Sequence, residues 1–300
     1  MSTNLGFIGD RILRSLVSKY PNECAKGIQI GDYTVIGASV LGRLHAHEGT
    51  NRDDAWAAGS DGKWLVASVS DGAGSRAQSR YGASYTANRL CHRLLRAISA
   101  QAKLRNLTDE ARSRMKEPPT LKEIVQKAFQ DTHADLDARS KRINIGLDEL
   151  HCTLLGLLLN TETGELATGQ VGDGLILGLA ENGEAIPLVE PPGTDDPGAS
   201  YFITQSNWEC YFEARSIDAV EARGFTTFYL MTDGVANDCQ YGPPQDILRR
   251  WANDIDREIR LIPSVEITAE RLRRYLANYR VQGSFDDRTL VVIYRSKTAG

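Results

Sequence analysis

The sequence is poor in cysteine, has no long apolar run and carries no excess of basic residues. Its 5 cysteines among 300 residues are scattered, with no CxxC pair, which excludes a disulfide scaffold and fits a reducing cytoplasm. No apolar run approaches the roughly 20 residues of a membrane helix, and the polar N-terminus does not fit a signal peptide. With 35 basic and 39 acidic residues the net charge is -4, which argues against a nucleic-acid footprint.

The remaining composition is average for a soluble globular protein. Hydrophobic residues make up 41% and charged residues 25%, which excludes disorder, collagen and a long coiled coil. A chain of this length buries roughly 75% of its unfolded surface, so it needs no metal to fold. We therefore expect any metal site to be functional.

Apolar patterning predicts strands and helices in a characteristic order. Helical spacing appears over residues 81–98, 121–136, 247–259 and 272–279, and Thr120 with Glu123 forms a capping-box pattern before the second of these. Strand patterns cover residues 33–41, 55–58, 64–69, 152–159, 166–171, 175–179, 201–204, 211–214, 226–231 and 289–294. Residues 1–30 show no clean period, 101–119 resemble a loop or a frayed helix end, and the proline-rich 187–200 resemble an exposed excursion.

This order predicts an α+β fold with mostly antiparallel sheets and helix pairs packed outside them. Helices and strands do not alternate, which argues against a doubly wound parallel sheet. The last strand follows the second helix pair, so it must join a sheet that already exists. We therefore expect one domain over residues 1–300, with 1–30 as an ill-defined extension.

Several apolar strands lead directly into an aspartate followed by glycine. The pairs are Asp71-Gly72, Asp173-Gly174 and Asp233-Gly234, while Asp53-Asp54 and Asp286-Asp287 stand just before strands. A single Asp-Gly pair is usually a turn. Strands that share one rim would bring all of these carboxylates together, and clustered carboxylates repel one another unless a cation binds. Oxygen ligands suit Mg²⁺ or Mn²⁺ better than Zn²⁺.

Six motifs in this order resemble a known family. They are NRDDA, SDGAGS, HCTLLGL, QVGDG, MTDGVAND and DDRTLVVIY, and they are similar to motifs of the type 2C metal-dependent protein serine/threonine phosphatases, most of all the compact bacterial branch. The resemblance implies a four-layer αββα sandwich with two central, mostly antiparallel sheets. It also implies hydrolysis of phosphoserine and phosphothreonine by direct attack of a water that bridges two Mg²⁺ or Mn²⁺ ions.

The resemblance assigns metal ligands to individual residues of this sequence. It implies that Asp71 bridges the two ions, that the carbonyl of Gly72 binds one of them, and that Asp233 and Asp286 hold the other. The family usually has a glutamate where this sequence has the shorter Asp53. The sequence leaves open whether that residue binds a metal directly or through water.

Two more ligand assignments concern neighbouring positions. Asp54 follows Asp53 in the family's first acidic motif and is assigned to the metal site. Asp173 matches a residue that binds a weaker third ion in related enzymes. The usual partner of that residue is replaced here by Asn237, with Asp238 one position further on.

A phosphate contact and a general acid remain to be assigned. Many relatives have histidine after the first Asp-Gly, where this sequence has Ala73, and many have an upstream arginine. His45 and His47 stand near the arginine position and would share one face of a strand. We expect one of them to contact phosphate or to protonate the leaving group; the alternative is a pair of surface histidines. Arg52 and Arg76 are further phosphate-binding candidates.

Other residues near the motifs have less specific roles. Cys152 and Cys239 lack the helix N-terminus that would lower a thiol pKa, so neither is expected to be a nucleophile. Thr153 matches a buried, structural threonine of the family. Residues 187–215 correspond to a variable flap, whose aromatic residues either recognise a substrate protein or belong to an ordinary strand pair (Trp208, Tyr211, Phe212).

The sequence therefore favours an active phosphatase and leaves two alternatives. One is a catalytically weak or inactive phosphatase fold that binds and regulates partners, which Asp53 and Ala73 would favour. The other is a phosphohydrolase for small molecules. The resemblance further implies a phosphoprotein substrate within a bacterial signalling circuit, where the protein reverses a partner serine/threonine kinase, and we expect a monomer.

Overall fold

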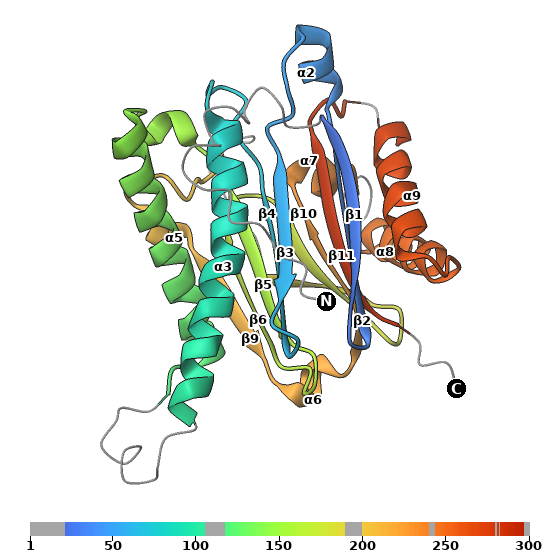
Figure 1. Cartoon of the computed structure of the whole chain (residues 1–300). Helices are drawn as coiled ribbons and strands as arrows, with labels where there is room; N and C mark the ends of the chain where they lie inside the picture. The colour runs from blue at the N-terminus through green and yellow to red at the C-terminus, as the bar shows by residue number, and fades with distance from the viewer. Residues whose placement is uncertain are drawn as a thin grey trace.

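Two antiparallel sheets lie face to face in the middle of the molecule (Figure 1). The computed structural model describes residues 22–105, 118–189, 200–239, 244–279, 281 and 283–296. One sheet has the order β1-β2-β11-β10-β7-β8, with β1 (Glu23–Ile30), β2 (Tyr33–Val40), β7 (Leu175–Ala180), β8 (Ala185–Val189), β10 (Phe225–Met231) and β11 (Arg288–Arg295). The other has the order β3-β4-β5-β6-β9, with β3 (Ala55–Ser60), β4 (Trp64–Ser70), β5 (Leu154–Asn160), β6 (Leu166–Val171) and β9 (Glu213–Ile217).

Helix pairs cover the outer face of each sheet. The long helices α3 (Ser79–Arg105) and α5 (Leu121–Ile143) pack on the sheet that contains β4, whereas α8 (Pro244–Arg260) and α9 (Val265–Asn278) pack on the other (Figure 1). Short helices in the connections are α2 (Arg43–Glu48), α6 (Ala219–Ala222), α7 (Asp233–Ala236), η2 (Leu147–Leu150), η3 (Trp208–Tyr211) and η4 (Asn237–Cys239). The expected α+β fold and its αββα layering are confirmed.

Strand β5 shows why the central strands read as continuous apolar runs. Leu155 and Leu157 pack in the core between the two sheets, while Leu154 and Leu158 pack in the core below α3 and α5. Successive side chains of a strand point to opposite faces. Because both faces are covered, every position from Leu154 to Asn160 is buried.

The predicted start of α5 is confirmed in detail. The backbone N–H of Glu123 donates to Thr120 Oγ1 at 3.2 Å, and the backbone N–H of Thr120 donates to Glu123 Oε2 at 2.7 Å. This reciprocal capping box satisfies two backbone donors that a helix N-terminus leaves unpaired. Helix α3 runs to Arg105, and the rest of the stretch 106–117, expected as a loop or frayed helix end, lies outside the described residues.

Several sequence-based boundaries were wrong at the edges of the sheets. Glu23–Ile30, placed in the ill-defined extension, is an edge strand whose residues are exposed or half-buried, so its apolar pattern is weak. Strand β8 occupies the start of the predicted excursion, and its Leu188 and Val189 are buried. Residues 201–204, expected as a strand, are not a strand: 201–202 are irregular and 203–204 begin a turn. The remaining part of the excursion, 190–199, lies outside the described residues.

The topology brings the acidic motifs to one edge of the two sheets. Strands β4, β6 and β10 end just before Asp71, Asp173 and Asp233, whereas β3 and β11 begin just after Asp54 and Asp287. Neighbouring strands are antiparallel, so the start of β3 lies beside the end of β4, and the start of β11 lies beside the end of β10.

Candidate metal centre

Asp54 lies at the middle of the acidic cluster and is 3% exposed. Its Oδ2 accepts a hydrogen bond from Thr232 Oγ1 at 2.8 Å, from the residue just before Asp233. Its Oδ1 is buried and has no hydrogen-bond donor among the residues that the structure describes. A buried carboxylate oxygen without a donor costs free energy, and a cation is the partner that such an oxygen lacks.

Asp71 is held by its backbone, which leaves its carboxylate available. Its N–H donates to Thr153 Oγ1 at 2.9 Å, and the Thr153 N–H donates to the Asp71 carbonyl at 2.8 Å. The following Gly72 is buried and forms an isolated antiparallel β-bridge with the backbone of Cys152. A Cβ at Gly72 would lie 2.9 Å from the carbonyl oxygen of Asp53, so only glycine allows this contact. This Asp-Gly pair therefore marks close backbone packing instead of a turn.

Burial and mutual repulsion raise the pKa of each central carboxyl. Burial, followed by the charges of Asp54 and Asp233, raises the pKa of Asp71 well above its usual value. Burial and then Asp287 raise the pKa of Asp54 to about 7, and burial and then Asp173 raise the pKa of Asp233 to about 8. Such clustered carboxyls need protons or cations to offset their charge.

Asp173 and Asp286 lie at the margin of the same cluster. Burial raises the pKa of Asp286, with Asp287 as the largest charge contribution. Burial also raises the pKa of Asp173, whose Oδ1 accepts a hydrogen bond from Ser200 Oγ at 3.0 Å. Asp173 contributes to the raised pKa values of both Asp71 and Asp233, so the structure brings all three together.

Asp53 faces a charged network formed by His45 and Asp287. Asp287 Oδ2 accepts hydrogen bonds from the Asp53 N–H at 2.6 Å and from His45 Nδ1 at 3.0 Å, while Oδ1 accepts from the Gly42 N–H at 2.6 Å. The bond to Asp287 raises the pKa of His45 to about 9 against the effect of burial. His45 Nε2 is 3.7 Å from Asp53 Oδ2. Burial raises the pKa of Asp53 to about 6.

Asp287 is the functional residue that the motif analysis missed. Its carboxylate is 4% exposed and connects the start of α2 to the loop before β3. The only sequence signal for it was its place in the pair Asp286-Asp287. Local sequence does not tell which of the two aspartates is a candidate ligand and which organises the site.

His45 and His47 would share one face only on a strand, and the structure places them on a helix instead. These residues lie on α2, so their side chains do not share a face as they would on a strand. His45 turns toward Asp53 and Asp287, whereas His47 is exposed. The structure thus separates the two candidates and places one of them at the carboxylate cluster.

The two arginine candidates differ in their surroundings. Arg52 is 6% exposed and donates to the backbone carbonyls of Asp54 and Ser39, both at 3.1 Å. Its guanidinium is used inside the fold, which argues against a phosphate contact. The Arg76 side chain is 37% exposed and lies 3.6 Å from Glu149.

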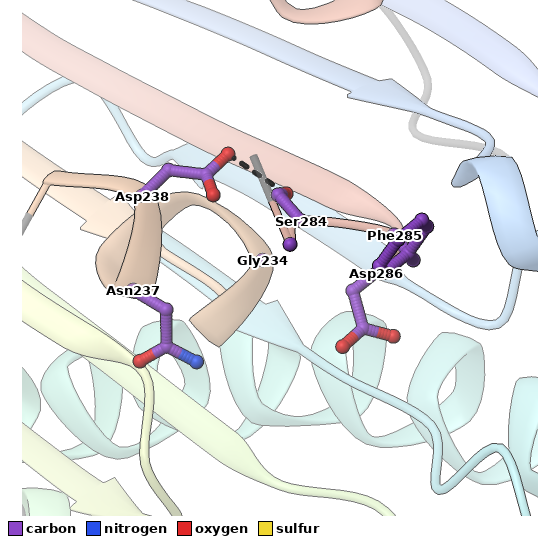
Figure 2. A pocket seen from close by; sticks show the side chains of 7 residues that line it. Gly234, Asn237, Asp238, Ser284, Phe285 and Asp286 are labelled. Atoms are coloured by element: carbon purple, nitrogen blue, oxygen red, sulfur yellow. Dashed lines mark hydrogen bonds between the residues drawn. The ribbon is translucent and has the colours of Figure 1, made fainter. Parts of the chain in front are cut away.

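Asp238, considered as a replacement partner for Asp173, faces away from the cluster. Figure 2 shows Asn237 and Asp286 pointing to the same side of a pocket of about 330 Å³, with Asp238 and Ser284 on the other side. Asp238 Oδ2 accepts from Arg288 Nε and from Ser284 Oγ, each at 3.0 Å. This buried ion pair gives Asp238 a structural role.

Cys152 and Cys239 are buried, and two of the flap aromatics, Trp208 and Phe212, pack in or against the core. Burial raises the pKa of Cys152 to about 11 and raises that of Cys239 further, which disfavours both thiolates. The three candidate aromatics pack against other rings or in the core: Trp208 is 4% exposed, the Phe212 ring centroid lies 4.9 Å from that of Phe129 on α5, and the half-buried Tyr211 stacks on Tyr201.

The residues present fit divalent cations in their chemistry. Oxygen ligands come from five segments of the chain, and among the described residues Asp54 Oδ1 has no hydrogen-bond donor. Among the described His, Cys, Asp and Glu side chains, no three are already spaced to hold one ion jointly. The cluster therefore supplies the charge and the ligand type that divalent cations need.

Comparison with known proteins shows the family. A sequence model of the protein phosphatase 2C family matches residues 41–278, so the chain belongs to this family. No curated protein matches the sequence. Within the described chain, no helix is long and apolar enough to cross a membrane.

Solved structures share the fold at low sequence identity. A serine-threonine phosphatase 2C from Toxoplasma gondii is 11% identical with a TM-score of 0.58, covering 92% of this chain and 99% of that chain. A C. elegans sex determining protein is 14% identical with a TM-score of 0.57, covering 90% of this chain and 65% of that one. PppA, a regulatory component of T6SS in Pseudomonas aeruginosa, is 12% identical with a TM-score of 0.52, covering 88% and 98%.

Proposed function

We propose that this protein is a Mg²⁺- or Mn²⁺-dependent phosphatase that hydrolyses phosphoserine and phosphothreonine in proteins. The observation that carries the proposal is the convergence of Asp54, Asp71 and Asp233 at one edge of the two sheets, where the buried Asp54 Oδ1 has no donor within the described part of the chain. Membership of the protein phosphatase 2C family supports the reaction class.

The proposed ligands are Asp53, Asp54, Asp71, Asp233 and Asp286, together with the carbonyl of Gly72. Divalent cations bound there would lower the pKa of a water molecule and offset negative charge on the phosphoryl oxygens. Asp173 stands beside this set and is the candidate for a weaker third ion.

His45 is the proposed phosphate-facing cation of the site. Asp287 fixes the ring through Nδ1, which leaves Nε2 on the side of Asp53. In the metal-free site the hydrogen bond to Asp287 raises the pKa of His45 to about 9. A protonated imidazole in this position can donate from Nε2 to a phosphoryl oxygen or to the leaving alkoxide.

Hydrolysis assays test the proposal directly. The protein is expected to hydrolyse p-nitrophenyl phosphate and a phosphothreonine peptide with Mn²⁺, to stop in EDTA, and to lose turnover on Asp71→Asn. Asp61→Asn is a matched control, because Asp61 lies in the β3–β4 hairpin and caps the N–H groups of Lys63 and Trp64. Unchanged turnover in EDTA would refute the proposal.

A second candidate is a phosphatase fold that binds a phosphoprotein without turnover. The absence of three described side chains already spaced for an ion favours it. Calorimetry with Mn²⁺ separates the two, since this candidate predicts no metal binding at millimolar concentration. A panel of nucleotides and small phosphoesters separates the remaining alternative, a small-molecule phosphohydrolase.

A further inference from the structure

Helix α2 is unusual because it buries none of its own residues. It nevertheless packs closely on the chain beside the candidate metal centre. A Cβ at Gly42 would lie 2.4 Å from the carbonyl carbon of Asp286, and the Leu44 N–H donates to the Phe285 carbonyl at 3.0 Å. Helix α2 is therefore fixed at the rim of the candidate site without contributing buried side chains to the core.

The rim exposes apolar surface next to a candidate ligand. Phe285, which directly precedes Asp286, is 50% exposed, and Leu44 is 47% exposed. Phe285 and Asp286 line the same pocket, with the α2 ribbon beside Phe285 (Figure 2). Exposed large apolar side chains that gather beside a polar site are a common feature of recognition surfaces.

The same rim carries an available positive charge. The Arg43 guanidinium lies 4.9 Å from the centre of the Phe285 ring, and within the described chain it forms no ion pair. The cation–π contact holds the two side chains together as one platform. The platform combines an aromatic face with a cation that lacks a carboxylate partner.

We propose that Arg43, Leu44 and Phe285 form the surface that recognises the substrate beside its phosphorylated residue. The substrate is a phosphorylated peptide segment that carries an apolar residue for Phe285 and Leu44 and an acidic residue for Arg43. Complementary charge selects among partners, and the apolar pair supplies contact area. This inference rests on the proposed phosphatase function and adds the substrate's sequence preference.

Kinetics with paired peptides tests this platform in the full chain. Two phosphothreonine peptides differ only in glutamate or lysine beside the phosphorylated residue, and kcat/KM is expected to be about fivefold higher for glutamate. Arg43→Glu is expected to reverse that order. Phe285→Ala is expected to lower kcat/KM for both peptides about tenfold relative to p-nitrophenyl phosphate, which has no flanking residues.

Val220→Ala is the matched control, because Val220 is 81% exposed on α6 and outside this rim. It should leave unchanged both the preference for the glutamate peptide and the ratio of kcat/KM for the peptides to kcat/KM for p-nitrophenyl phosphate. The inference would be overturned if Arg43→Glu still preferred the glutamate peptide. It would also be overturned if Phe285→Ala kept the wild-type ratio of kcat/KM for the peptides to kcat/KM for p-nitrophenyl phosphate.

A binding experiment separates this inference from the proposed function. Turnover of p-nitrophenyl phosphate with Mn²⁺ tests the phosphatase proposal alone. If there is no turnover, the same two peptides with a phosphonate in place of the phosphate ester are titrated by fluorescence anisotropy. Tighter binding of the glutamate peptide, reversed in Arg43→Glu, supports the platform, and equal affinities overturn it.

Discussion

The carboxylate of Asp287 accepts a hydrogen bond from the backbone N–H of Asp53 at 2.6 Å, across 234 positions of sequence. The same carboxylate accepts from the Gly42 N–H and contacts His45. One buried side chain therefore fixes three segments at the candidate metal centre. The alignment of Asp53 with the rest of the cluster depends on a residue that we do not assign as a ligand.

Asp287→Asn is expected to destabilise the protein although it keeps the size of the side chain. Both carboxylate oxygens accept from backbone donors, and an amide offers only one oxygen, so one buried N–H loses its partner. The expected cost is about 1–3 kcal/mol, measured by urea denaturation. Asp286→Asn is the control: its exposed side chain accepts no hydrogen bond from a described residue, so turnover should fall without that loss of stability.

Asp71→Asn is expected to raise the melting temperature of the metal-free protein. Burial and the neighbouring carboxylates raise the pKa of Asp71, so its charge opposes folding at neutral pH. The substitution removes that charge and keeps the backbone N–H bond to Thr153. A gain of about 1 kcal/mol corresponds to roughly 2–4 °C in a large domain.

Mn²⁺ should stabilise the wild type more than it stabilises Asp71→Asn, the reverse of the order expected without metal. An ion at about 100 times its Kd stabilises the folded wild type by about 2.7 kcal/mol, and Asp71→Asn should gain less. Thermal scans in EDTA and in Mn²⁺ give both comparisons. An equal Mn²⁺ response in the two proteins would show that Asp71 is not a ligand.

Asp238→Ala is expected to destabilise the fold strongly. The side chains of Asp238 and Arg288 are 2% and 5% exposed, so the substitution leaves a buried guanidinium without its carboxylate. Breaking such a pair costs about 3–5 kcal/mol, whereas replacing both partners by apolar residues costs far less. Urea denaturation of Asp238→Ala and of the double variant Asp238→Leu with Arg288→Met compares the cost of breaking the pair with the cost of replacing it. If Asp238→Ala instead lost a bound ion, Asp238 would be a metal ligand.

Asp135→Asn is expected to change stability in a pH-dependent way. Burial raises the pKa of Asp135, but hydrogen bonds from Arg89 and Arg93 outweigh it and lower the pKa below its usual value. The ionised form is therefore favoured in the folded state. Its stabilisation is fully present above the unfolded pKa of about 3.9 and is lost as pH falls through the folded pKa.

The measurement compares unfolding of wild type and Asp135→Asn across that range. At pH 7 the variant should be less stable by about 1–2 kcal/mol, since the pair is partly exposed and screened. The difference should shrink toward zero as pH falls below 4. A constant difference at all pH values would assign the effect to packing.

The strong periodic segments and the acidic motifs could be predicted from the sequence. Thr120 and Glu123 act within four residues of each other, so local chemistry alone fixes the start of α5. The doubly buried strand β5 was equally clear, because covering on both faces leaves a continuous apolar run. The edge strands β1 and β8 were not, because one-sided pairing and exposure weaken the apolar signal.

The tertiary structure decided which charged residues share a site. Local spacing placed His45 and His47 on one strand face, whereas α2 turns His45 toward Asp53 and leaves His47 exposed. Arg52 looked available for phosphate until the fold showed it bonded to backbone carbonyls. These outcomes depend on segments far apart in the chain, which no local pattern encodes.

The sequence by itself determined the layered α+β fold and the chemical type of the cluster, because side-chain periodicity and strand-end carboxylates are local properties. Only the tertiary structure decided that Asp287 organises the site, that Asp238 belongs to Arg288, and that Arg43 and Phe285 stand together at the rim. Each of these relationships joins distant segments that are brought together by strand pairing within a sheet or by the packing of the two sheets. Their energies arise from burial and hydrogen bonding that exist only once the sheets have formed.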